Sequence, residues 1–126
     1  MSIRDHFSLP IYVRIYIDKI TIHALDGSGR LLEGEPDTPF STQRLLIGEF
    51  KSAEKTLSEG FNSLRSGSIL KKSVRVVIHP VDMSEGGLSE VEEKVLRELA
   101  SSAGAHHFVI HTGSSLSQQE ALKLLG

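Results

Sequence analysis

Two histidines in this sequence each follow directly on a run of mostly apolar residues. His79 ends the segment "SVRVVIH" and His111 ends the segment "HHFVIH". Imidazole nitrogens bind zinc and exchange protons near neutral pH, so two of them at one edge of a sheet could form a ligand site. Asp18 and Asp82 could add carboxylate oxygens beside them. These four residues are the candidate edge for binding a phosphate, a nucleotide or a metal ion.

A metal centre is nevertheless not expected at this edge. Zinc sites use three or four protein ligands in fixed directions. Asp18 and Asp82 fall in predicted loops, where nothing in the sequence sets their orientation. His107 and His111 lie four residues apart on one strand, about 13 Å, which is too far for one ion. We therefore expect His79 and His111 to be neighbouring surface residues at strand ends, without a metal.

The common motifs of catalysis and cofactor binding are missing from the sequence. It has no GxxxxGK[ST], GxGxxG, GxSxG or HExxH pattern, and it has no cysteine. The glycines of "SEGG" (84–87) precede a predicted helix start, where an anion could bind. Glu85, Glu90, Glu92 and Glu93 crowd that helix start and would repel a phosphate. The prediction is therefore no catalytic residue and no cofactor.

In the first third of the chain, apolar and polar residues alternate as is typical of strands. "IYVRIYIDKITIHAL" (11–25) predicts two strands with a turn near Asp18. "DGSG" (26–29) supplies the glycines of a second turn, and "RLLEGEP" (30–36) predicts a third strand. A fourth short strand is predicted over "RLLIG" (44–48). The strands over 11–36 form a predicted antiparallel meander.

The rest of the chain alternates between helical and strand patterns. Apolar residues spaced by three and four predict a helix from Phe50 to about Ser66. Gly60 lies inside this helix, at a cost of about 1 kcal/mol relative to alanine. Strands are predicted over 73–80 and 106–112, and a helical crossover between them makes the two strands parallel.

Two further helices carry capping-box patterns at their starts. Ser89 with Glu92, and Ser117 with Glu120, place a serine three residues before a glutamate. Gly104 is the expected residue just beyond the end of the first of these helices. The predicted buried stripe of that helix consists of Leu88, Val91, Val95, Leu96 and Leu99.

The predicted order of elements is three antiparallel strands, helix, strand, helix, strand, helix. This order predicts an α/β fold with one mixed sheet and helices packed against it. A chain of 126 residues suits one domain, 1–126, without an internal linker or repeat.

The order and several local segments resemble a known family. A meander followed by βαβα is the order of the ribonuclease-H-like half of actin-type ATPases. "GRLLEGEP" and "ELASSAGAHHFVI" are similar to segments of bacterial actins of the MreB (rod-shape-determining) family. The resemblance spans nearly the whole chain, and it implies a single, truncated and degenerate actin-like subdomain.

The sequence departs from that family where the family binds nucleotide. Asp18 matches the aspartate of the family's phosphate loop, but Lys19 and Ile20 replace the small residues that a close approach of the backbone requires. His111-Thr112-Gly113 stands where the family has Glu-Glu-Pro, and Gly126 comes before any second phosphate loop. The resemblance therefore implies an actin-like domain without ATP chemistry.

Composition narrows the expected setting and partners. The net charge of −2 and the scattered basic residues argue against nucleic-acid binding. The lack of cysteine and of any run approaching about 18 apolar residues suggests a cytoplasmic protein without an integral membrane segment. The predicted function is non-catalytic, through contacts with a protein partner such as a bacterial actin-like or cell-shape protein, or with further copies of the chain. The alternative is a small phosphate- or nucleotide-binding enzyme that uses Asp18, His79, Asp82 and His111.

Overall fold

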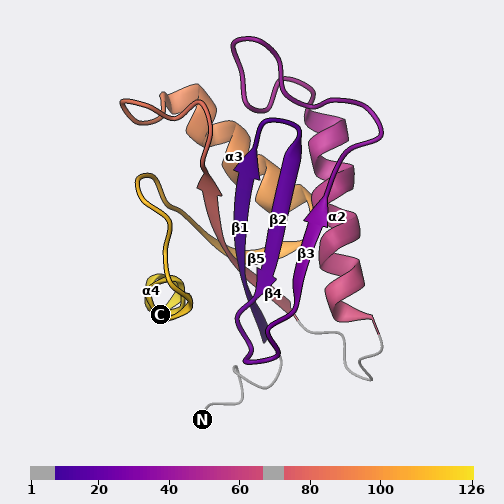
Figure 1. Cartoon of the computed structure of the whole chain (residues 1–126), viewed down its shortest axis with the longest axis vertical. Helices are drawn as coiled ribbons and strands as arrows, with labels where there is room; N and C mark the ends of the chain where they lie inside the picture. Colours follow the sequence, from indigo (N-terminus) through magenta and orange to yellow (C-terminus); the bar gives the residue numbers. More distant parts are fainter. Residues whose placement is uncertain (1–7, 67–72) are drawn as a thin grey trace.

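The computed structural model describes residues 8–66 and 73–126 of the chain. Its strands and helices alternate in the second half of the chain, as Figure 1 shows. In chain order the elements are β1 (Ser8–Tyr16), β2 (Lys19–Ala24), β3 (Leu31–Gly34), α2 (Phe50–Arg65), β4 (Ser73–Pro80), α3 (Glu90–Ser102), β5 (Ala105–Ile110) and α4 (Gln118–Leu125).

The strands form one mixed sheet of five strands in the order β3-β2-β1-β4-β5. β1 pairs antiparallel with β2, and β2 with β3, so the first three strands form the predicted meander. β1 also pairs parallel with β4, and β4 with β5. The predicted fold class, a mixed α/β sheet built from a meander followed by βαβα, is confirmed.

One prediction about the strands is wrong. Residues 44–48 form a loop, in which the Thr42 N–H donates to the Leu45 carbonyl at 2.8 Å and the Gly48 N–H to the Phe40 carbonyl at 2.7 Å. The apolar character of this segment has another cause, because Leu46 is buried in the core. The loop closes on itself and presents Leu46 inward, so its backbone does not pair with the sheet.

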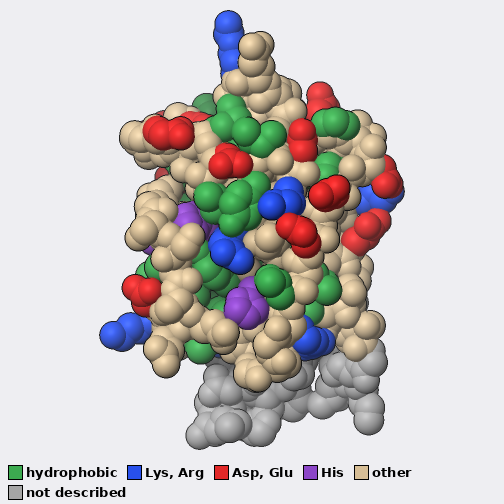
Figure 2. All heavy atoms as spheres, in the orientation of Figure 1, with side chains coloured by type: hydrophobic (Ala, Val, Ile, Leu, Met, Phe, Trp, Pro, Cys, Tyr) green, Lys and Arg blue, Asp and Glu red, His purple; other side chains and the backbone are tan. Residues whose placement is uncertain are grey.

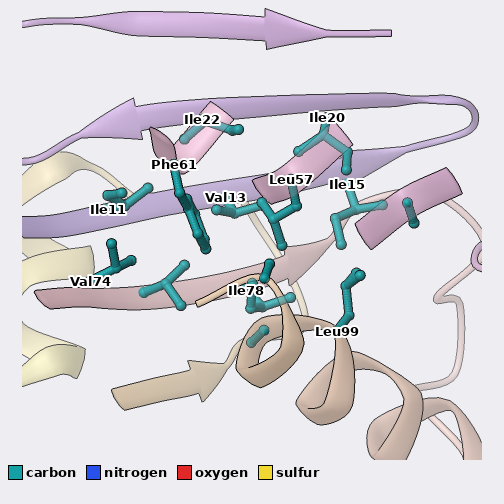
Figure 3. Close-up of a cluster of buried hydrophobic side chains, with 14 of the residues drawn as sticks. Ile11, Val13, Ile15, Ile20, Ile22, Leu57, Phe61, Val74, Ile78 and Leu99 are labelled. Carbon is teal, nitrogen blue, oxygen red and sulfur yellow. The ribbon is translucent and has the colours of Figure 1, made fainter. Parts of the chain in front are cut away.

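The main core lies between one face of the sheet and the helices α2 and α3 (Figure 3). Alternate residues of the strands enter it, because successive side chains of a strand point to opposite faces. Ile11, Val13 and Ile15 of β1 meet Leu57 and Phe61 of α2 in this layer, and all five side chains are buried.

Gly60 allows α2 to approach the sheet closely. A Cβ at this position would lie 2.0 Å from Cδ1 of Ile22, which is buried in β2. The glycine that weakens the helix in isolation is therefore required by the packing of the helix against β2.

The opposite face of the sheet carries α4 alone among the described helices. The buried part of this smaller layer consists of Tyr12, Leu25, Val77, Ala121 and Leu125. The helix leaves part of the face over β1, β2 and β3 open, and Figure 2 shows hydrophobic, basic, acidic and histidine side chains side by side there.

Both predicted capping boxes are present, and Gly104 has the expected positive φ, 112°. The predicted buried stripe of α3 is only partly right. Leu96 and Leu99 are buried, whereas the Val91 side chain is 71% exposed. The buried residues of α3 all lie in its second half, so its first turn extends beyond the part that packs on the core. In the part of the chain that the structure describes, none of these helices combines the length and apolarity needed to cross a membrane.

Candidate functional site

The four predicted site residues all lie near the carboxyl ends of the parallel strands or at the adjacent β1–β2 turn. His79 belongs to the end of β4, and His111 follows the last residue of β5. Their imidazole rings meet edge to face, with centroids 4.8 Å apart and planes at 72°. The predicted proximity of the two histidines is confirmed.

The prediction that both histidines are surface residues is wrong for His79, which is only 1% exposed. His79 lies on the sheet face that carries α4, and a ring of Tyr12 stacks near it with centroids 5.9 Å apart. The loop after β5 closes over it, since the Gly113 carbonyl lies 2.9 Å from Nε2 of His79. The sequence of β4 alone does not predict that Tyr12 and the loop at Gly113 bury His79.

The hydrogen bonds of His79 define its tautomer. A carbonyl oxygen can only accept, so Nε2 carries the hydrogen and donates it to Gly113. In the neutral ring Nδ1 is then the acceptor, and the Tyr12 hydroxyl donates to it at 2.7 Å. The same hydroxyl accepts the Leu116 N–H at 3.1 Å. Both ring nitrogens of His79 are thus used inside the protein.

The surroundings of His79 oppose its protonation. Burial is the largest cause that lowers its pKa from the ordinary 6.5, and the nearby charges of His111 and Arg14 lower the pKa further. The hydrogen bond to the Gly113 carbonyl raises the pKa, but the net shift is downward. A neutral, fully bonded imidazole is unsuited to proton transfer with a substrate unless the loop that covers it moves.

His111 is also used by the loop that follows it. Its Nε2 donates to the Ser114 carbonyl at 2.8 Å. The two histidines therefore hold the carbonyl groups of Gly113 and Ser114, just before Ser117 begins the capping box of α4. The two imidazoles therefore hold the segment between β5 and α4 in place. Their Nε2 atoms are bound to two different carbonyl groups and not to one shared ligand.

Asp18 is bound to a different segment. Its Oδ1 accepts the Ser41 N–H at 2.7 Å, and its own N–H donates to the Ser41 hydroxyl at 3.1 Å. That hydroxyl donates onward to the Leu46 carbonyl at 2.6 Å. Asp18 has a φ of 51°, a left-handed conformation that aspartate tolerates better than most residues. The residue joins the β1–β2 turn to the 41–46 loop.

Asp82 closes the same turn from the other side. Its Oδ2 accepts the N–H of Ile17 at 2.9 Å. The four predicted residues thus form two groups, with the histidines on the loop before α4 and the aspartates on the β1–β2 turn. Within residues 8–66 and 73–126, no three His, Asp or Glu side chains gather as a metal site would require. The absence of a bound metal stays a prediction.

Lys19, which the actin-like resemblance aligned with a phosphate loop, is also engaged in contacts within the chain. Its Nζ lies 4.7 Å from the centroid of the Tyr16 ring and 3.3 Å from Oε1 of Glu33. The ammonium group therefore faces a side chain of β3. This arrangement places a bulky, paired side chain where a nucleotide-binding turn needs open backbone N–H groups.

A cavity of about 380 Å³ lies at the same edge of the molecule, between the 81–87 loop and the loop after β5. Its lining includes Gly86, Gly87, Thr112 and Gly113, and its one charged lining residue is Glu85. A phosphate in this cavity would meet a carboxylate and no cationic side chain. Glu85, one of the glutamates predicted to repel a phosphate beside the 84–87 loop, therefore lines the cavity.

Sequence reasoning missed Tyr12 and Arg14 as neighbours of the histidines. Arg14 pairs with His79 in the β1–β4 register, and its guanidinium carbon lies 5.5 Å from the centroid of the Tyr12 ring. Alternation along β1 places both residues on one face. That Tyr12 and Arg14 lie beside His79 can be inferred only once β1 is known to pair with β4, and these two strands are far apart in the sequence.

Comparison with known proteins places the chain in a family. The chain is 35% identical over 120 residues to the uncharacterized protein YjaA of Escherichia coli (strain K12), an alignment that covers 89% of this chain and 92% of that protein. The chain belongs to the YjaA family. No general protein-family model matches the sequence.

Among solved structures, the chain is similar to MreB5 of Spiroplasma citri, which was crystallised bound to ADP. The TM-score is 0.63 with 13% sequence identity, and the match covers 83% of this chain. The YjaA-family chain spans 38% of the length of that MreB5 chain. The expected actin-like resemblance is therefore confirmed for the fold, while the family established by sequence is that of YjaA.

Proposed function

We propose that this YjaA-family chain is a non-catalytic actin-like domain that acts through contacts with other proteins. The observation that carries the proposal is the internal use of the candidate edge. The hydrogen bonds of His79, His111, Asp18 and Asp82 join strands, turns and loops of the chain to one another. Such groups stabilise the fold, and none of these bonds points to a reacting ligand.

The position of Lys19 supports the same proposal. A nucleotide-binding turn presents backbone N–H groups to a phosphate, usually through small residues. Here Ile17 N–H is taken by Asp82 and Asp18 N–H by Ser41. Binding a phosphate at this turn would require both of these hydrogen bonds to break.

The proposal also includes the kind of partner and its location in the cell. The MreB-like order of elements suggests a protein partner among bacterial actin-like or cell-shape proteins, in the cytoplasm. Assembly with further copies of the chain is a second form of the same kind of contact.

The alternative function is a small enzyme that binds a phosphate or nucleotide at the sheet edge. The observation in its favour is the cavity beside Gly86, Gly87 and Gly113 at the carboxyl ends of β4 and β5, where open α/β sheets bind ligands. This alternative requires saturable binding that depends on His111 or Asp18. The protein-contact proposal requires that partner binding survives changes to the same residues.

The test is quantitative affinity isolation of the tagged chain from the cell that produces it, after chemical cross-linking. Wild type and His111→Ala are compared, with an unrelated tagged domain as the background control. The proposal predicts one or more proteins enriched equally by wild type and variant. No protein above background, together with Mg-ATP hydrolysis that the His111 change abolishes, would favour the enzyme.

A further inference from the structure

The part of the chain beyond β5 is attached to the sheet mainly by side chains. Within residues 8–66 and 73–126, the last backbone hydrogen bond that joins it to β4 runs from the His111 N–H to the Ile78 carbonyl at 2.9 Å. Residues 112–126, the α4 segment, then cover part of the sheet face opposite α2 and α3 (Figure 1). The position of this segment therefore depends on what its side-chain contacts provide.

Three hydrogen bonds hold the start of the α4 segment around the buried imidazole of His79. They join Nε2 of His79 to the Gly113 carbonyl at 2.9 Å, Nε2 of His111 to the Ser114 carbonyl at 2.8 Å, and the Tyr12 hydroxyl to the Leu116 N–H at 3.1 Å. The same hydroxyl donates to Nδ1 of His79 at 2.7 Å, and the two imidazole rings meet edge to face. The attachment thus contains two rings that can take up protons.

Packing contributes less to holding α4 in place. Only Ala121 and Leu125 of its eight residues are buried, whereas α2 buries five residues. Leu122 and Leu124 of α4 are 38% and 42% exposed, and the bond from Nη1 of Arg75 to the Leu125 carbonyl is long, at 3.4 Å. A helix of eight residues is too short to be stable by itself in water. The order of α4 therefore depends on the hydrogen bonds that hold the residues before it.

The charged groups around His79 are mostly basic. His111 lies against its ring, and Arg14 of β1 pairs with it in the register of the sheet. Within the described ranges, neither His79 nor Arg14 forms an ion pair with a carboxylate. The acidic group nearby is Glu120 of α4, which interacts with His111 but lies in water and accepts the Ser117 N–H at 2.9 Å. A positive charge on His79 would therefore meet two basic neighbours and no partner of its own.

A proton on Nδ1 of His79 would disturb the attachment. In the neutral ring Nδ1 accepts the Tyr12 hydroxyl, but a protonated ring only donates, so this hydroxyl would have to turn its hydrogen away. Burial and the charges of His111 and Arg14 keep the pKa of His79 below its ordinary value while the segment is closed. A ring exposed to water escapes these effects, so proton uptake favours an open α4 segment.

We propose that the α4 segment is a proton-sensitive cover of the sheet, which opens when His79 takes up a proton while the rest of the chain stays folded. Opening removes α4 from Tyr12, Leu25 and Val77, which form the buried apolar layer beneath it. Acidification thereby turns this layer into an accessible surface. The inference goes beyond the proposed function, because opening can be measured without any partner protein.

Native-state hydrogen exchange of the full chain, followed amide by amide in NMR, tests the proposal. Rates at each pH are corrected for intrinsic exchange, and small additions of denaturant separate local opening from global unfolding. We expect the amides of Leu116 and residues 121–125 to exchange through an opening that denaturant barely affects. The amides of Leu57 and Phe61 in α2 should exchange only by global unfolding, and so with stronger protection at every pH.

Acidification should weaken the protection of the α4 segment. Between a pH of about 7.5 and one of about 5 we expect a loss of about 3- to 30-fold, the upper figure being the limit for one group that takes up a proton near 6.5 only in the open state. His79→Gln should lower the protection at high pH and remove most of its dependence on pH. His106→Gln, a change at an exposed histidine of β5, should keep the dependence of the wild type.

Thiol labelling provides a second measurement that does not require the His79 variant to fold. The chain has no cysteine, so Val77→Cys and Val76→Cys each introduce a single thiol. Both valines are fully buried, Val77 beneath α4 and Val76 in the main core, which makes them a matched pair. With rates corrected for the ionisation of a free thiol, Val77→Cys should be labelled at least about tenfold faster than Val76→Cys, and faster still at low pH.

Four results would each overturn the proposal. One is equal labelling of Val77→Cys and Val76→Cys. Another is protection of the α4 segment that matches that of α2 in level and in denaturant dependence, because the segment would then open only by global unfolding. The others are protection that does not change with pH, and a dependence on pH that persists undiminished in His79→Gln.

Discussion

The Tyr12 hydroxyl and Nδ1 of His79 lie 2.7 Å apart, although 67 residues separate them in the sequence. The parallel pairing of β1 with β4 brings them together, and the Leu116 N–H completes the arrangement by donating to the same hydroxyl. The sheet is thereby joined to the segment that begins α4. These bonds explain why the conspicuous histidine is buried and why its role is structural.

Removing the Tyr12 hydroxyl should destabilise the chain. Tyr12→Phe leaves Nδ1 of His79 without its donor and the Leu116 N–H without its acceptor, so we expect a loss of about 1–3 kcal/mol in the free energy of unfolding. Hydrogen exchange at Leu116 should become faster. Tyr16→Phe is the matched control, since it keeps the ring that Lys19 covers. Equal stability of Tyr12→Phe and wild type would show that the bond contributes nothing.

The lowered pKa of His79 predicts a dependence of stability on pH. The folded pKa lies below the ordinary 6.5, chiefly because of burial, so the unfolded chain takes up a proton at a pH where the folded chain does not. The stabilising contribution is complete above about 6.5 and is lost as the pH falls toward the folded pKa.

Chemical unfolding of wild type and His79→Gln at several pH values between about 5 and 8 tests this dependence. The gap in stability between the two proteins should be largest at the high end and should narrow on acidification. His106→Gln, a change at an exposed histidine, is the control for the loss of an imidazole. A gap that stays constant or widens at low pH would contradict the assignment of a neutral His79.

Asp18 should behave as a structural residue of the turn. Asp18→Ala removes the acceptor of the Ser41 N–H and places alanine at a φ of 51°, so we expect a loss of about 1–3 kcal/mol. Asp18→Asn keeps a side-chain oxygen and tolerates this φ, so it should cost far less. Thermal unfolding of both variants provides the measurement. If alanine and asparagine were equally tolerated, the link to Ser41 would be unimportant.

Gly60 should resist replacement by alanine. A Cβ there would lie 2.0 Å from Cδ1 of Ile22, and such overpacking costs about 1–3 kcal/mol even though alanine favours helix. Ile22→Val removes the Cδ1 atom, so the two changes combined should be less harmful than the sum of the separate effects. A double-mutant cycle of unfolding free energies measures this coupling, and strictly additive effects would refute the contact.

The local features of the fold could be predicted because each depends on a few neighbouring residues. The serine–glutamate pairs that start α3 and α4, and the Asp26-Gly27 turn, act within three or four residues of sequence. The order of elements then left few arrangements for the sheet, given right-handed parallel crossovers. This reasoning correctly predicted the mixed sheet and the proximity of His79 and His111.

The errors came from contacts that no local pattern encodes. The apolar 44–48 segment was predicted as a strand because its periodicity could not distinguish a strand from a loop that inserts Leu46 into the core. Val91 fits the helical stripe but lies beyond the packed half of α3. The surface position predicted for His79 failed because Tyr12 and the loop at Gly113 approach it from distant parts of the sequence.

The central claim, that the candidate edge holds the fold together and binds no nucleotide, is tested most directly by calorimetric titration of the chain with Mg-ATP. We predict no saturable heat, because the N–H groups of Ile17 and Asp18 and the ring nitrogens of His79 are already bonded within the chain. A dissociation constant at or below about 100 μM, roughly −5.5 kcal/mol, that is lost in Asp18→Asn or His111→Ala would contradict it.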